Sequence, residues 1–565
     1  MVLNPVLPCL NWPAAPRMRG GAARQQAGKT VHMKADYKGL RSGGITGWAG
    51  ARVLAGVLAV SSLVPQGAHA QEGGQPPAHA AQPSPPAAQA QDGTPRRLHS
   101  VIMRRQRAGV SPQDMAMIAE LENRTFQWFW DSADPVTGLV PDRYPSDQTQ
   151  ASVASVGFAL TAYGIGVERA YITRNQAVER TLRTLRTLQR LPQNATADNA
   201  AGYHGFFYHF LDHRTGLRFN HDIELSSIDT ALLMQGVLFT RSFYNRDTVQ
   251  EREVRQLAQA LFNRVDWRWM LRPDNRPSMG WTPEHGFLPN YWEGYSEGMM
   301  AYVLGLGSPT HALEPASWQA WLATNDKRWG DSYGQTFLNF APLFGHQYTH
   351  AWIDFHGIRD DWNRRKGLDY FENSRRAVYS QRAYAEANPG KWQDYGANIW
   401  GLTASDGPAD TTLVENGQQR RFFGYSARGV GRDYTQDDGT LAPTAAGGSI
   451  AFAPEIVIPA LRTMKERYGA RIYGKYGFVD AFNPSYRPAG ANGFWVDDTY
   501  LGIDQGPILL MIENWRTQLV WNTMKRNEVI RHGLLRAGFS GGWLGFASTQ
   551  QAKRVAAPAA DGHEG

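Results

Sequence analysis

The chain has 565 residues, of which 12% are aromatic, and its formal net charge is +7. Residues 1–70 hold eight basic residues and one acidic residue, so the excess charge lies there and the rest of the chain is balanced. A basic excess confined to the first part of a chain leaves no electrostatic footprint for nucleic acid, and we expect no nucleic-acid partner. The single cysteine, Cys9, lies in the same part, so no disulfide is expected in the remainder.

The first 110 residues read as a leader followed by a linker. A short apolar run at 53–64 lies behind Arg41 and Arg52, and Ala68-His69-Ala70 forms a small-x-small cleavage site. This pattern predicts a secretory signal peptide within residues 1–70. The run is too short for a bilayer span, so the mature form should have none; an uncleaved membrane anchor is the alternative. We therefore expect a periplasmic or secreted protein, and a monomer.

Composition divides the remainder into three parts. Residues 71–110 are rich in proline and alanine, which predicts a disordered linker, and residues 547–565 resemble a second disordered tail. The folded, catalytic domain should therefore span residues 111–546.

Apolar periodicity in that domain predicts helices and few consecutive strands. Helices are expected at 112–129, 152–170, 173–191, 226–238, 251–269, 292–304, 314–323, 336–343, 367–388, 453–468 and 500–525. Long loops at 131–151, 192–225, 271–292, 344–366 and 402–450 separate alternate helices. Such alternation favours an all-α closed helical barrel with its long loops gathered at one end. An open helical solenoid is the alternative, although no fixed-period repeat is present.

The stretch 203–238 places one acidic residue at a helix mouth. Residues 206–211 form a β-prone run, and 212–216 supply turn chemistry. Ser226, three residues before Asp229, then forms a capping-box pattern that opens a helix. Glu224 comes just before this cap, where an acidic side chain is placed to meet a ligand. We therefore expect Glu224 to be a catalytic acid.

Other carboxylates lie in loops beside aromatic residues and glycines. They are Asp131, Asp134, Asp142, Asp222, Glu293, Glu297, Asp406, Asp437, Asp438, Asp497, Asp498 and Asp504. Glycoside hydrolysis needs a protonated acid and an ionised carboxylate, and aromatic side chains offer flat faces for sugar rings. For most single aspartates, however, a cap or turn is the default, and Asp229 is interpreted in this way.

Neither metal nor nucleotide chemistry has a clear signature. His209 and His213 straddle a predicted turn and there is no H-E-x-x-H motif, so hydrogen-bonding loop histidines are favoured over metal ligands. The chain also lacks a P-loop, a strand-linked G-x-G-x-x-G and a G-x-S-x-G motif. No cofactor and no metal are expected.

Several segments resemble the glycoamylase-like domain of glycoside hydrolase family 144, which also occurs in part of the cyclic β-1,2-glucan synthases. They are PDR (141–143), GFFYHFLD (205–212), ELSSIDTALL (224–233), YWEGYSEG (291–298), GLTASDGP (401–408), DGTLAPTAAGGS (438–449), FAPE (452–455), YGKYGFVDAFNP (473–484) and YLGIDQGPILLMIENWRT (500–517). The resemblance covers roughly residues 115–530. It implies an (α/α)6 toroid barrel that hydrolyses β-1,2-glucan by an inverting mechanism without metal.

The resemblance also suggests roles for individual residues. Glu224 matches the family's general acid, Asp406 is the choice for the base side, and Asp142 matches an acid near the scissile bond. The PDR and YWEGYSEG segments suggest the substrate-binding residues Glu293, Glu297, Arg143, Tyr295 and Trp292.

The expected substrate is a β-glucan polysaccharide or oligosaccharide. The predicted signal peptide and the lack of a glycosyltransferase region favour a free periplasmic hydrolase over the synthase type. Endo action is favoured over exo action. A transglycosylase, an exo-acting enzyme that releases sophorose, a non-catalytic glucan-binding protein and a polysaccharide lyase are the alternatives.

Overall fold

The computed structural model describes residues 109–545, except 416–417, 489 and 491. The expected signal peptide (1–70), nearly all of the expected linker (71–110) and the expected tail (547–565) lie outside the described residues. No helix in the described range is long and apolar enough to span a membrane.

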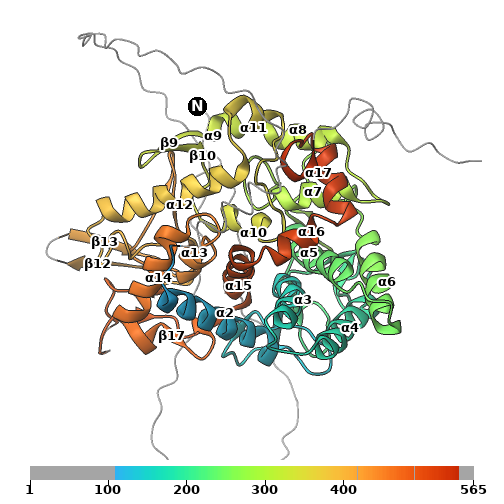
Figure 1. The fold of residues 1–565 in the computed structure, drawn as a ribbon, viewed down its shortest axis with the longest axis horizontal. Coiled ribbons are helices and arrows are strands. Elements are labelled where there is room, and N and C mark those ends of the chain that lie inside the picture. Colours follow the sequence, from blue (N-terminus) through green and yellow to red (C-terminus); the bar gives the residue numbers. More distant parts are fainter. Residues whose placement is uncertain (1–108, 416–417, 489, 491, 546–565) are drawn as a thin grey trace, which may run out of the picture.

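Helices make up most of the regular structure (Figure 1). They are α2 (Pro112–Ser132), α3 (Val153–Glu168), α4 (Arg174–Arg190), α5 (Ser227–Phe243), α6 (Val249–Asn263), α7 (Met299–Gly307), α8 (Pro315–Leu322), α9 (Asn325–Arg328), α10 (Phe344–Trp352), α11 (Asp361–Lys366), α12 (Tyr370–Ala387), α13 (Pro443–Gly447), α14 (Pro454–Tyr468), α15 (Gly502–Arg516), α16 (Leu519–Met524) and α17 (Glu528–Arg536).

The strands are short and pair antiparallel in small sheets. The pairs are β1 (Arg143–Tyr144) with β21 (Tyr500–Leu501), β2 (Gln150–Ser152) with β5 (Phe210–Asp212), β3 (Gly202–Tyr203) with β4 (Phe206–Phe207), β9 (Trp329–Ser332) with β10 (Gln335–Leu338), β11 (Ala404–Ser405) with β14 (Ser426–Ala427), β12 (Thr411–Glu415) with β13 (Gln418–Phe422), β15 (Gly429–Val430) with β16 (Thr435–Gln436), β17 (Tyr473–Gly474) with β18 (Gly477–Phe478), and β19 (Phe482–Asn483) with β20 (Trp495–Val496). The strands β6 (Leu225–Ser226), β7 (Gly280–Thr282) and β8 (Gly286–Phe287) form a three-stranded sheet.

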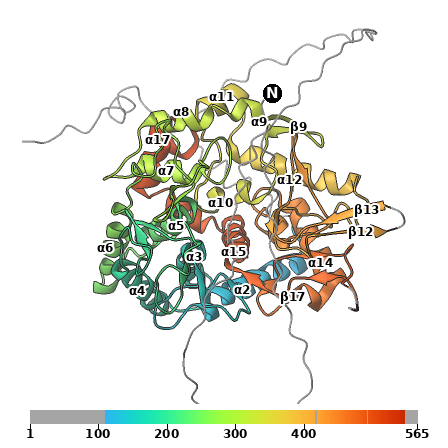
Figure 2. The ribbon, with the colours of Figure 1, turned by 180° about the vertical axis from the view of Figure 1, so that it is seen from behind.

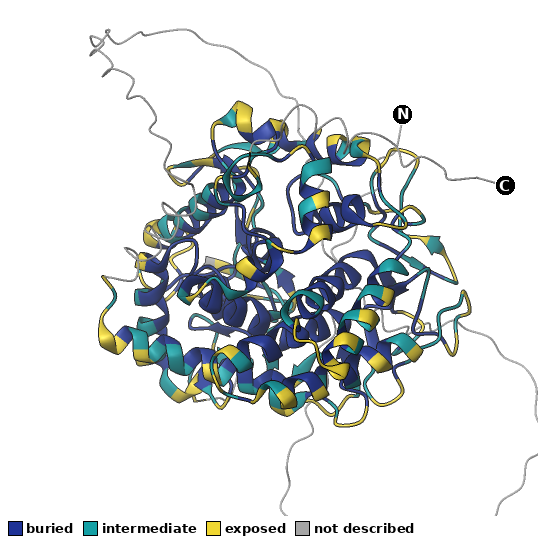
Figure 3. Ribbon diagram, turned by 45° about the vertical axis from the view of Figure 1, so that its right-hand side comes forward, coloured by how far each residue is buried: buried dark blue, intermediate teal, exposed yellow. Residues whose placement is uncertain are grey.

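Two classes of helix build the core. Helices α3, α5, α7, α10, α13 and α15 are buried over nearly their whole length. Helices α2, α4, α6, α12, α14 and α17 bury one face and expose the other (Figure 3). A helix that is buried all round belongs inside, and an amphipathic helix covers it. In Figures 1 and 2, α10 and α15 accordingly lie near the middle, and α2, α4, α6, α12 and α14 lie around them.

Small residues let the inner helices approach one another closely. At the crossing of α3 and α5, a Cβ atom added to Gly157 would overlap the backbone at Leu232, and one added to Gly236 would overlap the carbonyl of Gly157. Glycine at these positions allows the two helix backbones to touch. The close contact fixes the start of α5 relative to the start of α3.

Long loops precede several of the inner helices in the chain. The segments before α3, α5, α7, α13 and α15 carry Asp142, Glu224, Glu293, Asp406 and Asp497, respectively. Helix amino termini carry partial positive charge, which favours nearby carboxylates. The loop-borne acids are therefore held near the amino-terminal ends of the inner helices.

Most predicted helices are confirmed, but three segments differ. Residues 336–343 contain strand β10 and no helix, because the positive φ angles of Tyr333 and Gly334 form a hairpin turn to β9. The predicted helix 292–304 begins only at Met299. The predicted loop 344–366 contains α10 and α11.

Helix α10 was missed because its buried surface is polar. Gln347 donates to the carbonyl of Ala445 at 2.9 Å, and His346 bonds the carbonyl of Phe340 at 3.1 Å. These partners come from distant segments, so the sequence pattern of α10 lacks the apolar stripe of an ordinary helix. Helix α17 also lies beyond the predicted elements, and 500–525 is divided into α15 and α16.

Candidate active site

Glu224 lies beside a buried histidine and a second carboxylate. Its Oε1 atom is 3.0 Å from Nδ1 of His209, and Nε2 of His209 is 3.5 Å from Oδ1 of Asp229. We call these three residues the Glu224 group. The Glu224 side chain is 14% exposed, whereas His209 and Asp229 are buried. Glu224 is therefore the member of the group that faces solvent.

The backbone around the Glu224 group is fixed on both sides. The amide of His209 donates to the carbonyl of Glu224 at 2.9 Å, and Leu225 pairs with Trp281 on β7. A Cβ atom added to Gly280 would lie 3.0 Å from Cγ of Glu224, so glycine leaves the room that the acid occupies. The amide of Asp229 donates to the Ser226 hydroxyl at 3.2 Å, as the predicted cap requires, and this hydroxyl donates to the Asp229 carboxylate. The cap residue is thus shared between the helix start and the site.

Charges within the Glu224 group are strongly coupled. Burial alone would lower the pKa of His209, but Asp229, Glu224 and Asp142 outweigh burial and raise it to about 9. Burial raises the pKa of Asp229, and the opposing pull of His209 lowers it only in part. At neutral pH His209 is therefore an imidazolium, whose two N–H groups face two carboxyl groups.

A second cluster of acids surrounds Arg143. The Arg143 guanidinium donates from Nη1 to Asp406 at 2.6 Å and from Nε to Asp142 at 3.2 Å. The amide of Asp406 donates to Asp480 at 2.9 Å. We define the Asp406 group as Asp142, Arg143, Asp406, Asp480, Asp497 and Asp504. It joins three of the residues that the sequence nominated: Asp406, Asp142 and Arg143.

The acids of the Asp406 group differ in ionisation. Burial would raise the pKa of Asp406, but Arg143 holds it below its usual range. Burial and the Asp406 charge raise the pKa of Asp497 to about 6. Burial likewise raises the pKa of Asp504 to about 7 and that of Asp480 well above its usual value. Near neutral pH the group thus combines an ionised Asp406 and a mostly ionised Asp497 with two buried acids, Asp480 and Asp504, whose pKa values are raised further.

A buried ion pair supports the loop that carries Asp406. Arg428 and Asp438 are both fully buried and pair at 2.7 Å. Arg428 also donates to the carbonyl of Ser405 at 2.9 Å and to that of Asp406 at 3.4 Å. Asp438, one of the acids picked out by sequence, therefore positions the loop and does not itself face the site.

Shared electrostatic neighbours connect the two groups. Asp142 contributes both to the raised pKa of His209 and to that of Asp504. Burial raises the pKa of Tyr348 on α10, with contributions from Asp504 and from Asp229. The hydroxyl of Tyr425, an exposed residue, is likewise influenced by Asp406 and Asp142. Asp142 and Tyr348 are therefore within electrostatic range of both groups, and Tyr425 is within range of the Asp406 group.

Two aromatic side chains of the YWEGYSEG segment are more deeply buried than a substrate-binding role allows. Trp292 and Tyr295 are 2% and 0% exposed; Trp292 donates to Ser227 at 2.9 Å, and the Tyr295 hydroxyl bonds Ser374 at 3.0 Å. These two side chains lie in the core, where a sugar cannot contact them, so their prediction as substrate-binding residues does not match their positions. Glu293 is partly exposed and pairs with Arg276.

Glu297, from the same segment, is a buried acid without a hydrogen-bond partner. It is 1% exposed, and neither carboxyl oxygen has a partner among the described residues. Burial, with a smaller contribution from Asp229, raises its pKa to about 8. Glu297 is therefore neutral at neutral pH and lies behind the Glu224 group, not at a surface open to substrate.

Aromatic side chains that the sequence analysis did not nominate cluster on and around the β6–β8 sheet, which follows Glu224. Trp281, on the strand paired with Leu225, has its ring 5.6 Å from that of Trp269, and Trp269 lies 5.0 Å from Phe287. Phe287 is 44% exposed. Partly exposed rings offer flat faces for a sugar. In the sequence, Trp281 and Phe287 flank a turn, and this pair of aromatic residues was the signal from which the cluster could have been predicted.

The ligand-type atoms in these groups form proton-sharing networks. One atom each from His209, Glu224 and Asp229 lie within 4.8 Å of one another, and so do those of Asp406, Asp480 and Asp497. A doubly protonated imidazolium has no lone pair for a metal. Asp406 is neutralised by Arg143, and burial raises the pKa values of Asp480 and Asp497. Both networks therefore favour acid–base chemistry.

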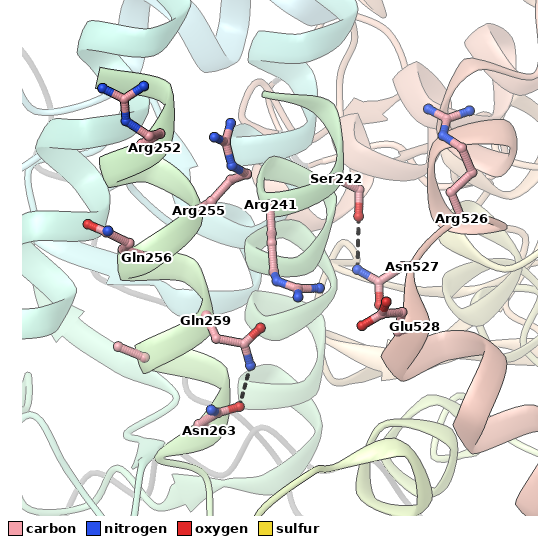
Figure 4. Close-up of a pocket in the computed structure, with 11 residues that line it drawn as sticks. Arg241, Ser242, Arg252, Arg255, Gln256, Gln259, Asn263, Arg526, Asn527 and Glu528 are labelled. Atoms are coloured by element: carbon pink, nitrogen blue, oxygen red, sulfur yellow. Dashed lines mark hydrogen bonds between the residues drawn. The ribbon is translucent and has the colours of Figure 1, made fainter. Parts of the chain in front are cut away.

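A separate hollow of about 810 Å³ lies between α5, α6 and α17 (Figure 4). Its lining includes Arg241, Arg252, Arg255 and Arg526 but a single acid, Glu528. It lies at the carboxyl-terminal end of α5, whereas Glu224 lies at the amino-terminal end, about 20 Å away at 1.5 Å per residue. Without a pair of carboxyl groups, this hollow is not the hydrolytic site.

Comparison with known proteins finds a matching family model and similar solved structures. A family model described as "Putative glucoamylase" matches residues 289–528. A solved structure described as a putative glucoamylase from Bacteroides caccae is 30% identical, with a TM-score of 0.65, and the match covers 76% of this chain and 100% of that one.

Two further relatives have named activities. The endo-β-1,2-glucanase from Chitinophaga pinensis, solved with sophorotriose and glucose, is 29% identical with a TM-score of 0.66, over 77% of this chain and 100% of that chain. An exo β-1,2-glucooligosaccharide sophorohydrolase from Parabacteroides distasonis is 27% identical over 451 residues, which is 74% of this chain. The chain spans 57% of that relative's length.

The resemblance noted from the sequence motifs is thereby confirmed over most of the described residues. The match to the B. caccae structure covers that whole chain, and the family model covers the segments that carry Glu293, Asp406 and Asp504. The chain belongs to the glycoamylase-like family of glycoside hydrolases.

Proposed function

We propose that this protein hydrolyses β-1,2-glucan, with Glu224 as the general acid and the Asp406 group activating water. The observation that carries the proposal is the contrast between the surroundings of two carboxyl groups. Glu224 faces a buried imidazolium at 3.0 Å, and Asp406 is held ionised by Arg143 at 2.6 Å. The named activities of the C. pinensis and P. distasonis relatives support the choice of substrate.

In this mechanism Glu224 donates a proton to the glycosidic oxygen as the bond to the anomeric carbon breaks. The Asp406 carboxylate removes a proton from the attacking water, directly or through a hydroxyl group of the substrate. Asp497, whose pKa of about 6 lies close to working pH, receives or returns protons beside Asp406. Attack from the face opposite the leaving group inverts the anomeric configuration.

The inner and outer helices support an (α/α)6 toroid as the scaffold. Six nearly buried helices alternate with amphipathic ones along the described chain, and the acid-bearing loops precede inner helices. In a closed ring of this kind, all of those loops gather at one end. We propose that this end is the active-site mouth.

Substrate contacts are proposed from the positions of the side chains. Trp281 and Phe287 offer stacking faces on the sheet that follows Glu224, and Tyr425 is exposed and within electrostatic range of Asp406. Arg143 both orients Asp406 and presents donors at the site. We propose endo action by a monomer that is secreted or periplasmic, as the apolar run at 53–64 and its cleavage site favour.

The decisive experiment is incubation of the protein with linear β-1,2-glucan. Product sizes followed over time distinguish endo action, which gives a range of oligosaccharides, from exo action, which gives sophorose alone from the outset. Proton NMR of the first products reports the anomeric configuration, and an inverting enzyme gives the α-anomer first. Longer or cyclic products at high glucan concentration would instead identify a transglycosylase, and absence of cleavage would overturn the proposal.

A further inference from the structure

His209 joins the catalytic acid to a third titratable group deeper in the fold. Nδ1 of His209 is 3.0 Å from Glu224, and Nε2 is 3.5 Å from Asp229. Both ring nitrogens therefore face carboxyl oxygens. A neutral imidazole can donate to only one of them, whereas an imidazolium donates to both.

The position of the His209 ring is fixed by its surroundings. The ring stacks on Phe210 with centroids 3.9 Å apart, and the backbone of His209 bonds Glu224 at 2.9 Å and Val153 at 3.2 Å. Asp229 is in turn held by the hydroxyl of Ser226, the α5 cap. The imidazole therefore has little freedom to leave Glu224, so the contact is preorganised.

All the charged groups that act on His209 are acids. Glu224 comes from the segment before β6, Asp229 from the first turn of α5, and Asp142 from the loop before α3. Their combined charge exceeds the effect of burial and raises the pKa of His209 to about 9. The ring remains positively charged throughout the neutral range. It therefore presents a fixed cation to one oxygen of Glu224.

The other oxygen of the acid is available to substrate. Within the described residues, Oε2 of Glu224 has no protein hydrogen-bond partner, while Oε1 accepts from His209. The proton for catalysis therefore belongs on Oε2. When Glu224 loses that proton, the negative charge spreads over both oxygens, and the charge on Oε1 is met by the N–H group of His209.

We propose that His209, held by Asp229, is the positioning residue of Glu224 and stabilises the carboxylate that forms as Glu224 protonates the leaving group. This inference rests on the proposed function. In the step, the O–H bond at Oε2 breaks, a new O–H bond forms on the glycosidic oxygen, and the electrons of the C–O bond go to that oxygen. His209 keeps both of its protons and Asp229 keeps the ring oriented. The proton lost by Glu224 is replaced from solvent before the next turnover.

A leaving-group comparison tests this role directly. Glucan needs strong protonation of its leaving oxygen, whereas a nitrophenyl glycoside of a β-1,2-gluco-oligosaccharide needs little. For His209→Asn we expect kcat on glucan to fall about 100-fold and kcat on the nitrophenyl substrate to fall less than about fivefold. The alkaline limb of the glucan pH–rate profile should also shift, because the cation beside the acid is gone.

Two variants serve as comparisons. Asp229→Asn leaves His209 in place but removes the charge that keeps it protonated, so activity on glucan should be lost at alkaline pH and recovered at lower pH. His532→Asn alters an exposed histidine on α17, far from the site, and should match the wild type on both substrates. If His209→Asn fails to fold by circular dichroism, His209→Gln and Asp229→Asn carry the test.

The outcomes separate the two proposals. Equal losses on both substrates, with an unshifted pH profile, would overturn the role of His209 while leaving hydrolysis by Glu224 intact. If the wild type does not cleave β-1,2-glucan at all, the proposed function itself fails. A large loss confined to glucan, with a shifted alkaline limb, supports His209 as the positioning residue.

Discussion

The Glu224 group and the Asp406 group use similar side chains for opposite purposes. In the first, carboxyl groups flank a buried imidazolium, and Glu224 at its edge has one oxygen facing that cation. In the second, an arginine neutralises Asp406, and burial raises the pKa values of the acids around it. The difference teaches that the environment of a carboxyl group, and not its identity, assigns the acid and base roles.

Replacing Glu224 should give the largest effect and test the acid side of the comparison. Glu224→Gln keeps the size and the contact with His209 but removes the transferable proton, so kcat on glucan should fall at least about 1,000-fold. Glucan binding, measured by calorimetry, should change little. The matched control is Glu253→Gln, which alters a glutamate on α6 that pairs with Arg186, and should keep wild-type turnover. Near-normal turnover of Glu224→Gln would remove Glu224 from the mechanism.

The base side is tested by Asp406→Asn. The amide cannot accept a proton from water, so kcat should fall about 100-fold or more, and added azide should restore part of the rate by acting as an external nucleophile. Asp433→Asn, at a surface aspartate paired with Arg432, is the control. If Asp406→Asn retains activity but Asp497→Asn does not, the base is Asp497. The base would then still belong to the Asp406 group, but it would be a different member of that group.

Glu297 is more deeply buried than Glu224, and its burial predicts how stability depends on pH. Its folded pKa of about 8 lies above the ordinary value of 4.5, so its contribution to stability is full below pH 4.5 and is lost as the pH rises through 8. That loss is on the order of 3 kcal/mol or more. Glu297→Gln should therefore unfold at a higher temperature than the wild type at pH 9 and at a similar temperature at pH 4.5. If scanning calorimetry shows the same difference in unfolding temperature at pH 4.5 and at pH 9, Glu297 is not a buried, neutral acid.

The smallest effect is expected at the aromatic residues of the sheet that follows Glu224. Trp281→Ala removes a stacking face, so KM for glucan should rise about tenfold, or about 1.4 kcal/mol, with kcat changed less than about threefold. Tyr333→Ala, an exposed ring on the β9–β10 hairpin, is the control and should leave KM unchanged. An unchanged KM for Trp281→Ala would place the sugar path elsewhere, nearer to Tyr425.

The sequence analysis succeeded where local patterns decide structure. Ser226 and Asp229 form the predicted cap of α5, and Ser111 with Pro112 begins α2 as expected. It failed at α10, whose polar residues are satisfied by partners such as Ala445, about 100 residues away. Local periodicity cannot register such partners, because a buried polar helix looks like a loop until its contacts are known.

The candidate site divides in the same way. Glu224 was predicted from its place before a helix cap, and Asp406, Asp142 and Arg143 were predicted from the family resemblance; their roles stay predictions. Trp292 and Tyr295 were predicted from the same resemblance, yet they pack into the core. Whether a side chain is buried depends on which other segments pack against it, and the sequence of one segment does not contain that information.

By itself, the sequence determined the helical class, the caps that set where most helices begin and the acids that the loops carry. Only the tertiary structure decided that His209 lies between Glu224 and Asp229, that Arg143 joins Asp142 to Asp406, and that Glu297 is buried without a partner. Caps and periodicity depend on neighbours within a few residues. The ionisation of an acid instead depends on burial and on charges brought within a few ångströms by segments up to several hundred residues apart.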